Sequence, residues 1–439
     1  MAKRKVYVID GARTPFLKAR GDIGPFSAAD LAVAAGRTVF TRSPVAPDMI
    51  DEAIVGCVIP APDEANIARI IALRLGCGKK VPAFTVQRNC ASGLQALASA
   101  HERITLGYSD IVLAGGTEAM SRSPIQWNAA MVGWLSQVMR ARSLPARLGA
   151  IARLRPAYLK PIFTLLLGLS DPLVRLSMGQ TAEIVAKRFG ITREQMDAYA
   201  FSSHRRLAAA FDDGRMDEEV VHLFDSRGNT YSEDSGMRRE TDMEKLAKLR
   251  PVFDRKYGLV TSGNSSQITD GAAMLLLASD KAVEKHDLPV LGELVGHEWA
   301  GVDPRQMGLG PVHAVAGLLK RQSISIKEID HMELNEAFAA QVLGCQAAWD
   351  SAEYCKTELG LSQPVGAIDS ARLNPDGGAV SCGHPIGASG ARLVLHVLLA
   401  LKRNGGGQGI ATLCIGGGQG GAMLVRVGEM AKPEAKNEQ

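Results

Sequence analysis

The 439-residue sequence has few of the features that mark nucleic-acid-binding or disulfide-stabilised proteins. Its formal net charge is only +4 at pH 7, so no general nucleic-acid surface is indicated. Its seven cysteines are scattered and include no C-x-x-C pair. This pattern indicates neither a disulfide framework nor a zinc site, and it fits a reducing compartment.

Long hydrophobic runs are absent as well. The most apolar stretch, PIFTLLLGL (residues 161–169), is too short to span a bilayer. The N-terminus starts with basic residues, but only the short apolar run VYVI precedes Asp10, which is too little for a secretory signal. We therefore expect a first β-strand here, in a cytoplasmic protein.

Acidic residues are missing from one long segment. None occurs between Ala119 and Ser170, where basic residues stand among Leu, Ile and Phe, namely Arg140, Arg142, Arg147, Arg153, Arg155 and Lys160. Such a stretch could lie on a membrane surface or dock on a partner. The alternative is a solvated helical face of an inserted domain, and the sequence favours neither.

The composition, 46% hydrophobic and 22% charged, is that of an ordinary globular protein, long enough for two domains or one large double unit. Strand-like runs such as KVYVID, DIVLAGG and GIATLCI alternate with helical patterns such as LQALASAHERITLG. This alternation predicts an α/β protein with largely parallel, buried strands.

An internal repeat divides the chain. The segments that begin NCASGLQ (from residue 89) and IGASGAR (from residue 386) share an A-S-G opening, a helix, a turn and an apolar strand that runs into glycines. We infer a duplicated α/β domain, with chemistry where corresponding loops meet beyond the strand ends. The predicted parts are residues 1–119 with 252–285, an inserted domain 120–251, a second half 286–430 and a tail 431–439.

Cys90 lies between a strand-like run and a helical run in VQRNCASGLQALASA. It could be a buried apolar filler, which is the commoner role of a free cysteine. It could instead be a nucleophile at a helix N-terminus, where the helix dipole stabilises a thiolate. These residues alone favour the filler.

Three loops in the second half add reactive groups. Asn335 and Glu336 follow a short apolar strand, His384 lies in a glycine-rich turn, and Cys414 ends an apolar strand before three glycines. Each alone fits a structural role. Together with Cys90 they supply a nucleophile, a base, a second proton carrier and oxyanion donors. Metal binding is the rival use, but the intervals lack the short spacings of zinc ligands.

These loops resemble the four motifs of the thiolase family, acyl-CoA C-acyltransferases, and the match runs over essentially the whole chain. The family motifs C-x-S, N-E-A-F, G-H-P and C-x-G stand here in the family's order as Cys90-Ala91-Ser92, Asn335-Glu336-Ala337-Phe338, Gly383-His384-Pro385 and Cys414-Ile415-Gly416. The resemblance implies a five-layer αβαβα fold made of two α/β halves, with an inserted loop domain.

The resemblance also implies a mechanism. His384 would deprotonate Cys90, which attacks the 3-keto carbon of a 3-ketoacyl-CoA, and Cys414 would protonate the departing acetyl-CoA enolate. His384 and a water held by Asn335 would face the enolate oxygen, and the N–H groups of Cys90 and Gly416 the other oxyanion. The reverse direction would condense two acetyl-CoA molecules.

Coenzyme A is expected as a co-substrate, with no permanently bound cofactor and no metal. By the family pattern, Arg238 would approach its nucleotide, Ser262 and Ser266 its pantetheine arm, and Met178 the acyl group. The resemblance also implies a homodimer or homotetramer.

The segment from about Trp134 to Leu169 resembles an insertion in thiolase subunits of the fatty-acid oxidation trifunctional complex. It implies contact with a hydratase/dehydrogenase subunit or a peripheral position at a membrane. Those subunits tend to have histidine in place of Asn335 and to lack a cysteine at the position of Cys382, so this site resembles the mainstream thiolases instead.

Two rival functions remain at this point. A ketoacyl synthase shares the fold and a cysteine nucleophile, but it typically carries two histidines, and Cys414 argues against it. A non-catalytic acyl-CoA-binding or scaffold protein would keep the fold without turnover.

Overall fold

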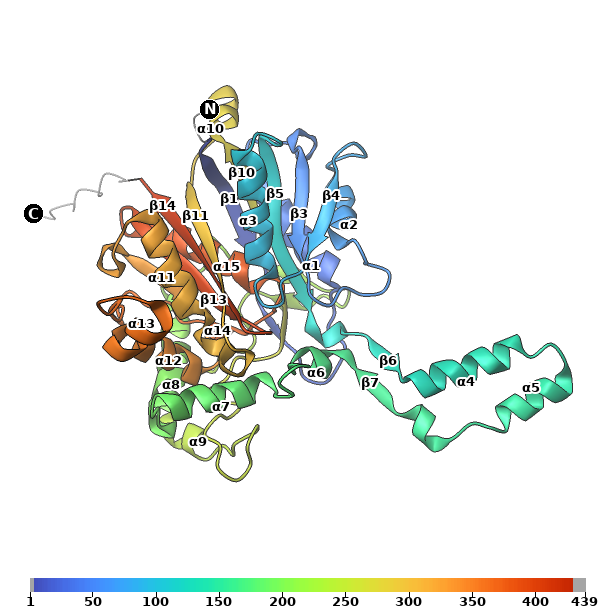
Figure 1. Ribbon diagram of the computed structural model, residues 1–439. Coiled ribbons are helices and arrows are strands. Elements are labelled where there is room, and N and C mark those ends of the chain that lie inside the picture. The colour runs from blue at the N-terminus through green and yellow to red at the C-terminus, as the bar shows by residue number, and fades with distance from the viewer. Residues whose placement is uncertain (1–3, 429–439) are drawn as a thin grey trace, which may run out of the picture.

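The computed structural model describes residues 4–428. Strands from both halves of the chain lie side by side in one central sheet (Figure 1). The predicted tail, residues 431–439, lies outside the described residues. The strands are β1 (Val6–Arg13), β2 (Leu17–Lys18), β3 (Glu52–Gly56), β4 (Ala83–Val86), β5 (Ile111–Ala119), β6 (Ile125–Trp127), β7 (Pro161–Phe163), β8 (Leu223–Phe224), β9 (Thr230–Tyr231), β10 (Thr269–Ser279), β11 (Gly292–Gly301), β12 (His331–Leu334), β13 (Gly407–Ile415) and β14 (Gln419–Val427).

The α-helices alternate with these strands in both halves, as the sequence predicts. They are α1 (Ala28–Arg42), α2 (Ile67–Arg74), α3 (Ser92–Thr105), α4 (Ala129–Arg140), α5 (Leu144–Ile151), α6 (Thr164–Gly168), α7 (Met178–Arg188), α8 (Arg193–Asp212), α9 (Met243–Ala247), α10 (Asp280–His286), α11 (Gly310–Gln322), α12 (Ala339–Asp350), α13 (Ala352–Leu359), α14 (Ala379–Cys382) and α15 (Ser389–Arg403). No described helix is long and apolar enough to cross a membrane.

The central sheet has the strand order β12-β13-β14-β11-β1-β10-β5-β3-β4, with β2 paired to β10. The two halves repeat one pattern: β12 and β13 are parallel and then antiparallel to β14, just as β3 and β5 are parallel and then antiparallel to β10. Among the described strands, the two halves pair with each other only where β1 meets β11. The expectation of largely parallel strands is therefore wrong, because β14 returns directly along β13 as a hairpin, and β10, which follows the insertion, runs antiparallel to both of its neighbours.

The molecule has five layers, because the strands carry apolar residues on both faces and helices pack on each face. On β10, Met274, Leu276 and Ala278 pack outward under α1 and α2, while the alternating residues point inward. Helices α3 and α15 fill the middle layer between the two halves, and α11 and α12 cover the far side. Strands with both faces covered read as continuous apolar runs, as here.

Glycine permits the close approach of α3 and α15 at their N-termini. A Cβ atom on Gly93 would lie 2.8 Å from the carbonyl oxygen of Gly387 and 2.9 Å from the nitrogen of Ala391. A Cβ atom on Gly390 would overlap the backbone of Leu94. The glycines of the two A-S-G motifs thus bring together the helix ends that carry the loops of Cys90 and His384.

Residues 125–163 form a projecting arm, built from the paired strands β6 and β7 and from helices α4 and α5 (Figure 1). The arm contacts itself through bonds such as that from Trp134 Nε1 to the carbonyl oxygen of Ala150, at 2.9 Å. The rest of the insertion includes α7 and α8, which pack on α12 and α14.

Replacing Gly390 by alanine tests the contact between α3 and α15. The new methyl group would push against the backbone of Leu94, so we expect the free energy of unfolding to fall by about 1 to 3 kcal/mol. Chemical denaturation with circular dichroism measures this.

The matched control is Gly149→Ala, in a helix of the arm where an added Cβ meets nothing within 4 Å. It should leave stability unchanged or raise it by up to about 1 kcal/mol, because alanine favours helix. Equal stability of both variants would contradict the packing argument.

Candidate active site

Cys90 occupies the turn between β4 and α3, as the sequence predicts. Asn89 has a left-handed backbone with φ 43°, which turns the chain sharply. The side-chain amide of Asn89 donates to the carbonyl oxygen of Gly416 at 2.8 Å, so the first loop is tied to the fourth. Cys90 itself is half-buried.

Burial raises the pKa of the Cys90 thiol, although the backbone N–H of Gly416 acts in the opposite direction. Desolvation of the charge thus outweighs the backbone donors, and the start of α3 alone does not favour the thiolate. A thiol of this kind needs a base before it can act as a nucleophile.

His384 lies between α14 and α15, next to Gly383, whose φ of 106° favours glycine. Its backbone N–H donates to the carbonyl oxygen of Gln267 at 3.1 Å, and its Nδ1 lies 2.6 Å from Oγ of Ser389. Burial, followed by the charge of Arg392, lowers the pKa of His384 to about 4. The ring is therefore neutral at pH 7 and can accept a proton.

Asn335 brings the third loop to the same place. It follows β12, its backbone N–H donates to Thr412, and its Nδ2 lies 3.4 Å from Nε2 of His384. Its Oδ1 is buried without a hydrogen-bond partner among the described residues. A buried amide oxygen without a partner is a site for a water or a substrate group.

Glu336 anchors this loop from behind. Its buried carboxylate accepts hydrogen bonds from Tyr199 and Ser203 on α8, from Asn374 and from the N–H of Val380. Burial still raises the pKa of Glu336, in spite of these bonds. The carboxylate ties the insertion to the loops of Asn335 and His384.

Cys414 and Gly416 close the site from β13. Cys414 is buried, and burial, with the thiols of Cys90 and Cys345 nearby, raises its pKa. Met178, the first residue of α7, packs with Cys414, and its Sδ lies 3.5 Å from where a Cβ of Gly416 would be. These contacts join Cys90, Cys414, Gly416 and Met178. The bond from Asn335 to Thr412 and the approach of Gly93 to Gly387 bring the loops of Asn335 and His384 next to them.

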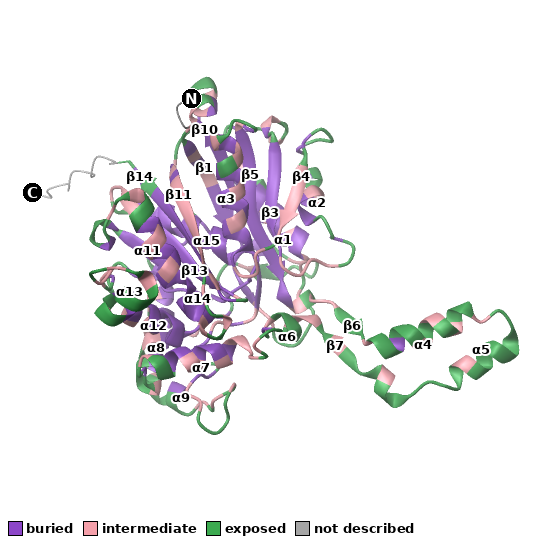
Figure 2. Cartoon of the chain, viewed as in Figure 1, coloured by how far each residue is buried: buried purple, intermediate pink, exposed green. Residues whose placement is uncertain are grey.

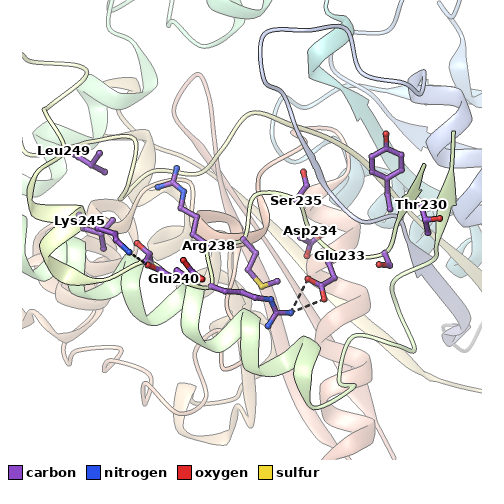
Figure 3. A pocket seen from close by; sticks show the side chains of 14 residues that line it. Thr230, Glu233, Asp234, Ser235, Arg238, Glu240, Lys245 and Leu249 are labelled. Atoms are coloured by element: carbon purple, nitrogen blue, oxygen red, sulfur yellow. Dashed lines mark hydrogen bonds and ion pairs between the residues drawn. The ribbon is translucent and has the colours of Figure 1, made fainter. Parts of the chain in front are cut away.

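Arg238 lies elsewhere, on the wall of a cavity of about 850 Å³ lined by residues between Thr230 and Leu249 (Figure 3). The chain from Ser262 to Gln267 connects this cavity with the loops. At one end Gly263 packs on Leu246 and Leu249 of the cavity wall. At the other, the N–H of Ser266 donates to Ala337 at 3.0 Å. Ser262 is exposed, and no contact places it at the four loops.

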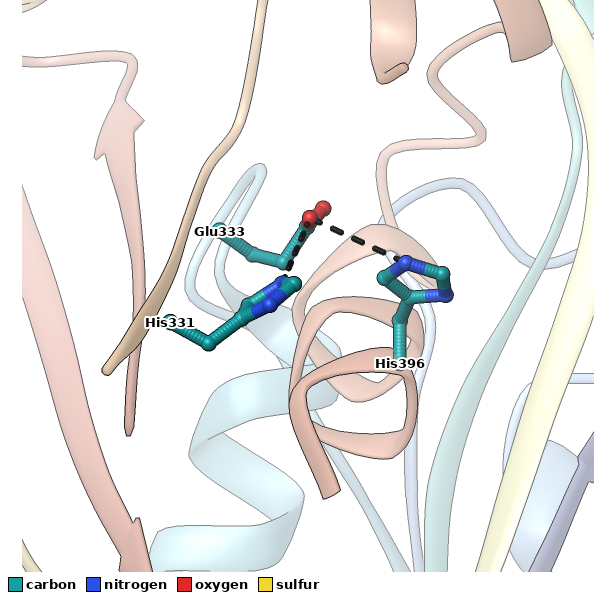
Figure 4. Close-up of side chains that lie close together, drawn as sticks. All are labelled: His331, Glu333 and His396. Atoms are coloured by element: carbon teal, nitrogen blue, oxygen red, sulfur yellow. Dashed lines mark hydrogen bonds and ion pairs between the residues drawn. The ribbon is translucent and has the colours of Figure 1, made fainter. Parts of the chain in front are cut away.

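A buried cluster of metal-ligand residue types lies behind the site, with His331 and His396 on either side of Glu333 (Figure 4). Arg392 Nη1 bonds Glu333 at 2.5 Å, and His396 Nδ1 lies 2.8 Å from Glu219. Although burial opposes it, the charge of His396 and the other partners hold the pKa of Glu333 below its usual range. The guanidinium supplies the positive charge that a metal would otherwise bring, so the cluster is an ion-pair network.

Sequence reasoning missed two residues that shape the site, and it singled out Glu336 without its anchoring role. Ser389 contacts His384 as described above, and Glu118 accepts bonds from the N–H groups of Val58 and Ile59. Burial raises the pKa of Glu118 to about 7. Only Ser389 had a signal in the sequence, as the serine of the second A-S-G motif.

Comparison with known proteins agrees with this geometry. The family models "Thiolase, N-terminal domain" and "Thiolase, C-terminal domain" match residues 6–281 and 288–427. A 3-ketoacyl-CoA thiolase of Yersinia enterocolitica is 37% identical over 425 residues, 96% of this chain and 97% of that protein.

Solved structures give the same result. Human mitochondrial 3-ketoacyl-CoA thiolase has a TM-score of 0.83 at 34% identity, covering 97% of this chain and 99% of that one. The acetyl-CoA acetyltransferase of Bacillus anthracis has a TM-score of 0.84 at 36% identity, again covering 97% and 99%.

The duplicated five-layer fold and these likenesses define an acyltransferase enzyme. The chain belongs to the thiolase family. This assignment favours the thiolase interpretation over a ketoacyl synthase and over a non-catalytic acyl-CoA-binding protein.

Proposed function

We propose that this enzyme cleaves a 3-ketoacyl-CoA with coenzyme A into an acyl-CoA and acetyl-CoA, and catalyses the reverse condensation. The observation that carries the proposal is the convergence of Cys90, Cys414, His384 and Asn335 from both halves of the chain. A relative solved with coenzyme A, the human mitochondrial 3-ketoacyl-CoA thiolase, supports coenzyme A as the co-substrate.

Cys90 is the nucleophile in this mechanism, and neutral His384 takes its proton. The thiolate attacks the 3-keto carbon, and the N–H of Gly416, together with that of Cys90, stabilises the oxyanion. Cleavage of the carbon–carbon bond leaves an acyl group on Cys90, and a second coenzyme A removes it. A thiolate is both a strong nucleophile and a good leaving group, so each step can run backwards.

The departing acetyl-CoA enolate meets a second set of groups. Protonated His384 donates to its oxygen, beside a water held by Oδ1 of Asn335. The Cys414 thiol protonates its carbon. Burial keeps this thiol protonated until the enolate, a far stronger base, forms beside it.

Coenzyme A lies, in this proposal, along the segment from Ser262 to Gln267. Its nucleotide occupies the cavity of Arg238, its pantetheine arm passes Ser262 and Ser266, and the acyl group reaches Met178. Support comes from the two ends of that segment, which touch the cavity wall and the backbone of His384. Fatty-acid oxidation is the process to which 3-ketoacyl-CoA cleavage belongs.

Cys90→Ser tests the nucleophile. We expect coenzyme A-dependent loss of 3-ketoacyl-CoA by the wild type, and a fall in kcat of about three orders of magnitude or more in the variant. The assay follows 3-ketoacyl-CoA absorbance for chains of four to sixteen carbons, and the preferred length identifies the natural substrate class.

Cys77→Ser is the matched control, since Cys77 is a buried free cysteine outside the four loops. It should keep most of the activity. A wild type inactive at every chain length would contradict the proposed reaction, and an active Cys90→Ser variant would contradict the role of Cys90.

We also propose a homodimer, which two such units could extend to a homotetramer. Strand β4 is an open edge of the central sheet, with Phe84 and Val86 half-buried. The carbonyl oxygens of Pro82 and Val86 accept bonds from Ala53 and Cys57, so the backbone groups of Ala83 and Thr85 between them face away from the sheet. The carbonyl oxygen of Ala83 accepts from the Asn66 side chain at 3.1 Å, and antiparallel pairing with β4 of a second copy would satisfy the N–H groups of Ala83 and Thr85.

Sedimentation velocity should show a species of at least twice the 46.7 kDa chain mass. Hydrogen exchange should be slow at Ala83 and Thr85, because the second copy covers them. A 46.7 kDa species with fast exchange at both amides is the result that contradicts the dimer.

The arm is proposed to dock on an anionic membrane surface, which would make the enzyme peripheral at a membrane. Most of the arm is exposed (Figure 2), including its large apolar side chains Ile125, Trp127, Val132, Leu135, Met139, Leu144, Leu148, Ile151, Leu154, Leu159 and Phe163. It carries basic and no acidic residues. Helices of this composition bind anionic lipid.

Flotation with vesicles tests the arm. Wild type should float with phosphatidylglycerol vesicles and stay behind with phosphatidylcholine alone. The triple variant Arg140→Gln, Arg142→Gln, Arg147→Gln should lower the bound fraction at least about tenfold, because each cation near the surface contributes about 1 kcal/mol.

The matched control, Lys79→Gln with Lys80→Gln, removes exposed charge from the body of the protein and should float like the wild type. Failure of the wild type to float would contradict the membrane proposal. Copurification of a hydratase/dehydrogenase subunit through the same arginines would then assign the arm to a partner protein.

A further inference from the structure

The two serines of the A-S-G motifs hold equivalent places in the fold. Ser92 is the first residue of α3, and Ser389 is the first residue of α15. Both are buried, and each follows a loop that carries a reactive group. Each hydroxyl donates to a backbone carbonyl oxygen, but the second partner is a backbone N–H at Ser92 and an imidazole nitrogen at Ser389.

Ser92 stabilises the turn of Cys90 through the backbone alone. Its hydroxyl donates to the carbonyl oxygen of Asn89 at 2.7 Å and accepts from the N–H of Arg88 at 2.9 Å. One donated and one accepted bond use the single proton and one lone pair of the hydroxyl.

Ser389 repeats this arrangement with an imidazole in place of the backbone N–H. Its hydroxyl donates to the carbonyl oxygen of Pro385 at 3.0 Å, and its Oγ lies 2.6 Å from Nδ1 of His384. Since the hydroxyl has one proton, Oγ must accept from Nδ1, and Nδ1 must carry the hydrogen.

The proton count then fixes the other ring nitrogen. A neutral imidazole with its hydrogen on Nδ1 has a lone pair on Nε2, the nitrogen that lies 3.4 Å from the amide of Asn335. Nε2 is therefore the basic atom on the side of the Asn335 loop.

We propose that Ser389 is a positioning residue, which holds His384 in the tautomer whose Nε2 lone pair takes the proton of Cys90. This inference rests on the proposed function, because it assumes that His384 is the base for Cys90. No bond to Ser389 changes when Nε2 receives that proton. Nδ1–H donates to Oγ both before and after the transfer, so the ring need not turn.

Ser389→Ala removes the acceptor for Nδ1–H, so the neutral ring can also adopt the tautomer with hydrogen on Nε2, which is no base for Cys90. Alkylation of Cys90 by iodoacetamide reports this without any coenzyme A substrate. The tryptic peptide of residues 89–103 contains Cys90 as its only cysteine and can be quantified by mass spectrometry.

At pH 7 we expect alkylation of Cys90 in Ser389→Ala to be about 10- to 100-fold slower than in the wild type, since a general base contributes an effect of this order. The alkylation rates of the variant and the wild type should become equal as the pH rises to the range in which the Cys90 thiol ionises without a base. A merely structural defect would slow the reaction at every pH.

A double-mutant cycle tests whether Ser389 affects Cys90 through the ring of His384. In a His384→Ala background, Ser389→Ala should change the alkylation rate less than about twofold, because its effect passes through the ring. Ser381→Ala, which removes another buried hydroxyl, from α14 just before the loop and without a bond to the ring, should behave like the wild type.

An equal loss at all pH values, a further loss in the His384→Ala background, or no loss at pH 7 would each overturn the role of Ser389. Failure of the proposed reaction is a separate result. It would show as a wild type that turns over no 3-ketoacyl-CoA, whatever the alkylation rates are.

Discussion

The close packing of α3 against α15 in the middle layer is the contact on which the site depends. Both helices begin where they touch, and Gly93 and Gly390 let backbone meet backbone there. The loop before α3 carries Cys90 and the loop before α15 carries His384. A side chain at either glycine would separate the two helix ends, and with them the groups that must exchange a proton. The duplicated A-S-G motif thus has two parts with different tasks: its glycines bring the halves together, and its serines order the loops.

Buried charge supports the same region from behind. Arg13 bonds Glu219 and Asp234, Glu219 bonds His396, and Arg392 bonds Glu333. The network spans β1, the inserted domain, β12 and α15, so it fixes the direction in which the loops leave their elements. Its members are costly to separate, because a lone charge at this depth has no water to solvate it. The charge of Arg392 also reaches His384 and helps to keep that ring neutral.

Much of the framework could be predicted from local patterns. The strand at Val6–Arg13, the helix after Cys90 and the strand that carries Cys414 near its end all follow from apolar periodicity and from glycine at the turns. Strand direction could not be predicted, since a fully buried strand reads the same whether its neighbour is parallel or antiparallel. The net effect on the pKa of Cys90 could not be predicted either, because the sequence shows the helix start but not the burial of the thiol. The pattern of the arm indicated its basic and apolar character, and only the structure shows that it projects from the body.

The sequence by itself determined the family, the duplication and which four loops carry reactive side chains, because these depend on residue types and on their order along the chain. Only the tertiary structure decided how those side chains meet. Cys90 and Gly416 lie far apart in sequence, and packing of the two halves brings their loops together, whereas the fold of the second half alone places Asn335 beside His384. The tautomer of His384 is likewise a tertiary property. It follows from the single hydroxyl proton of Ser389, which goes to the carbonyl oxygen of Pro385, so that Nδ1 of His384 must be the donor to Oγ. No pattern of residues along the chain can show this.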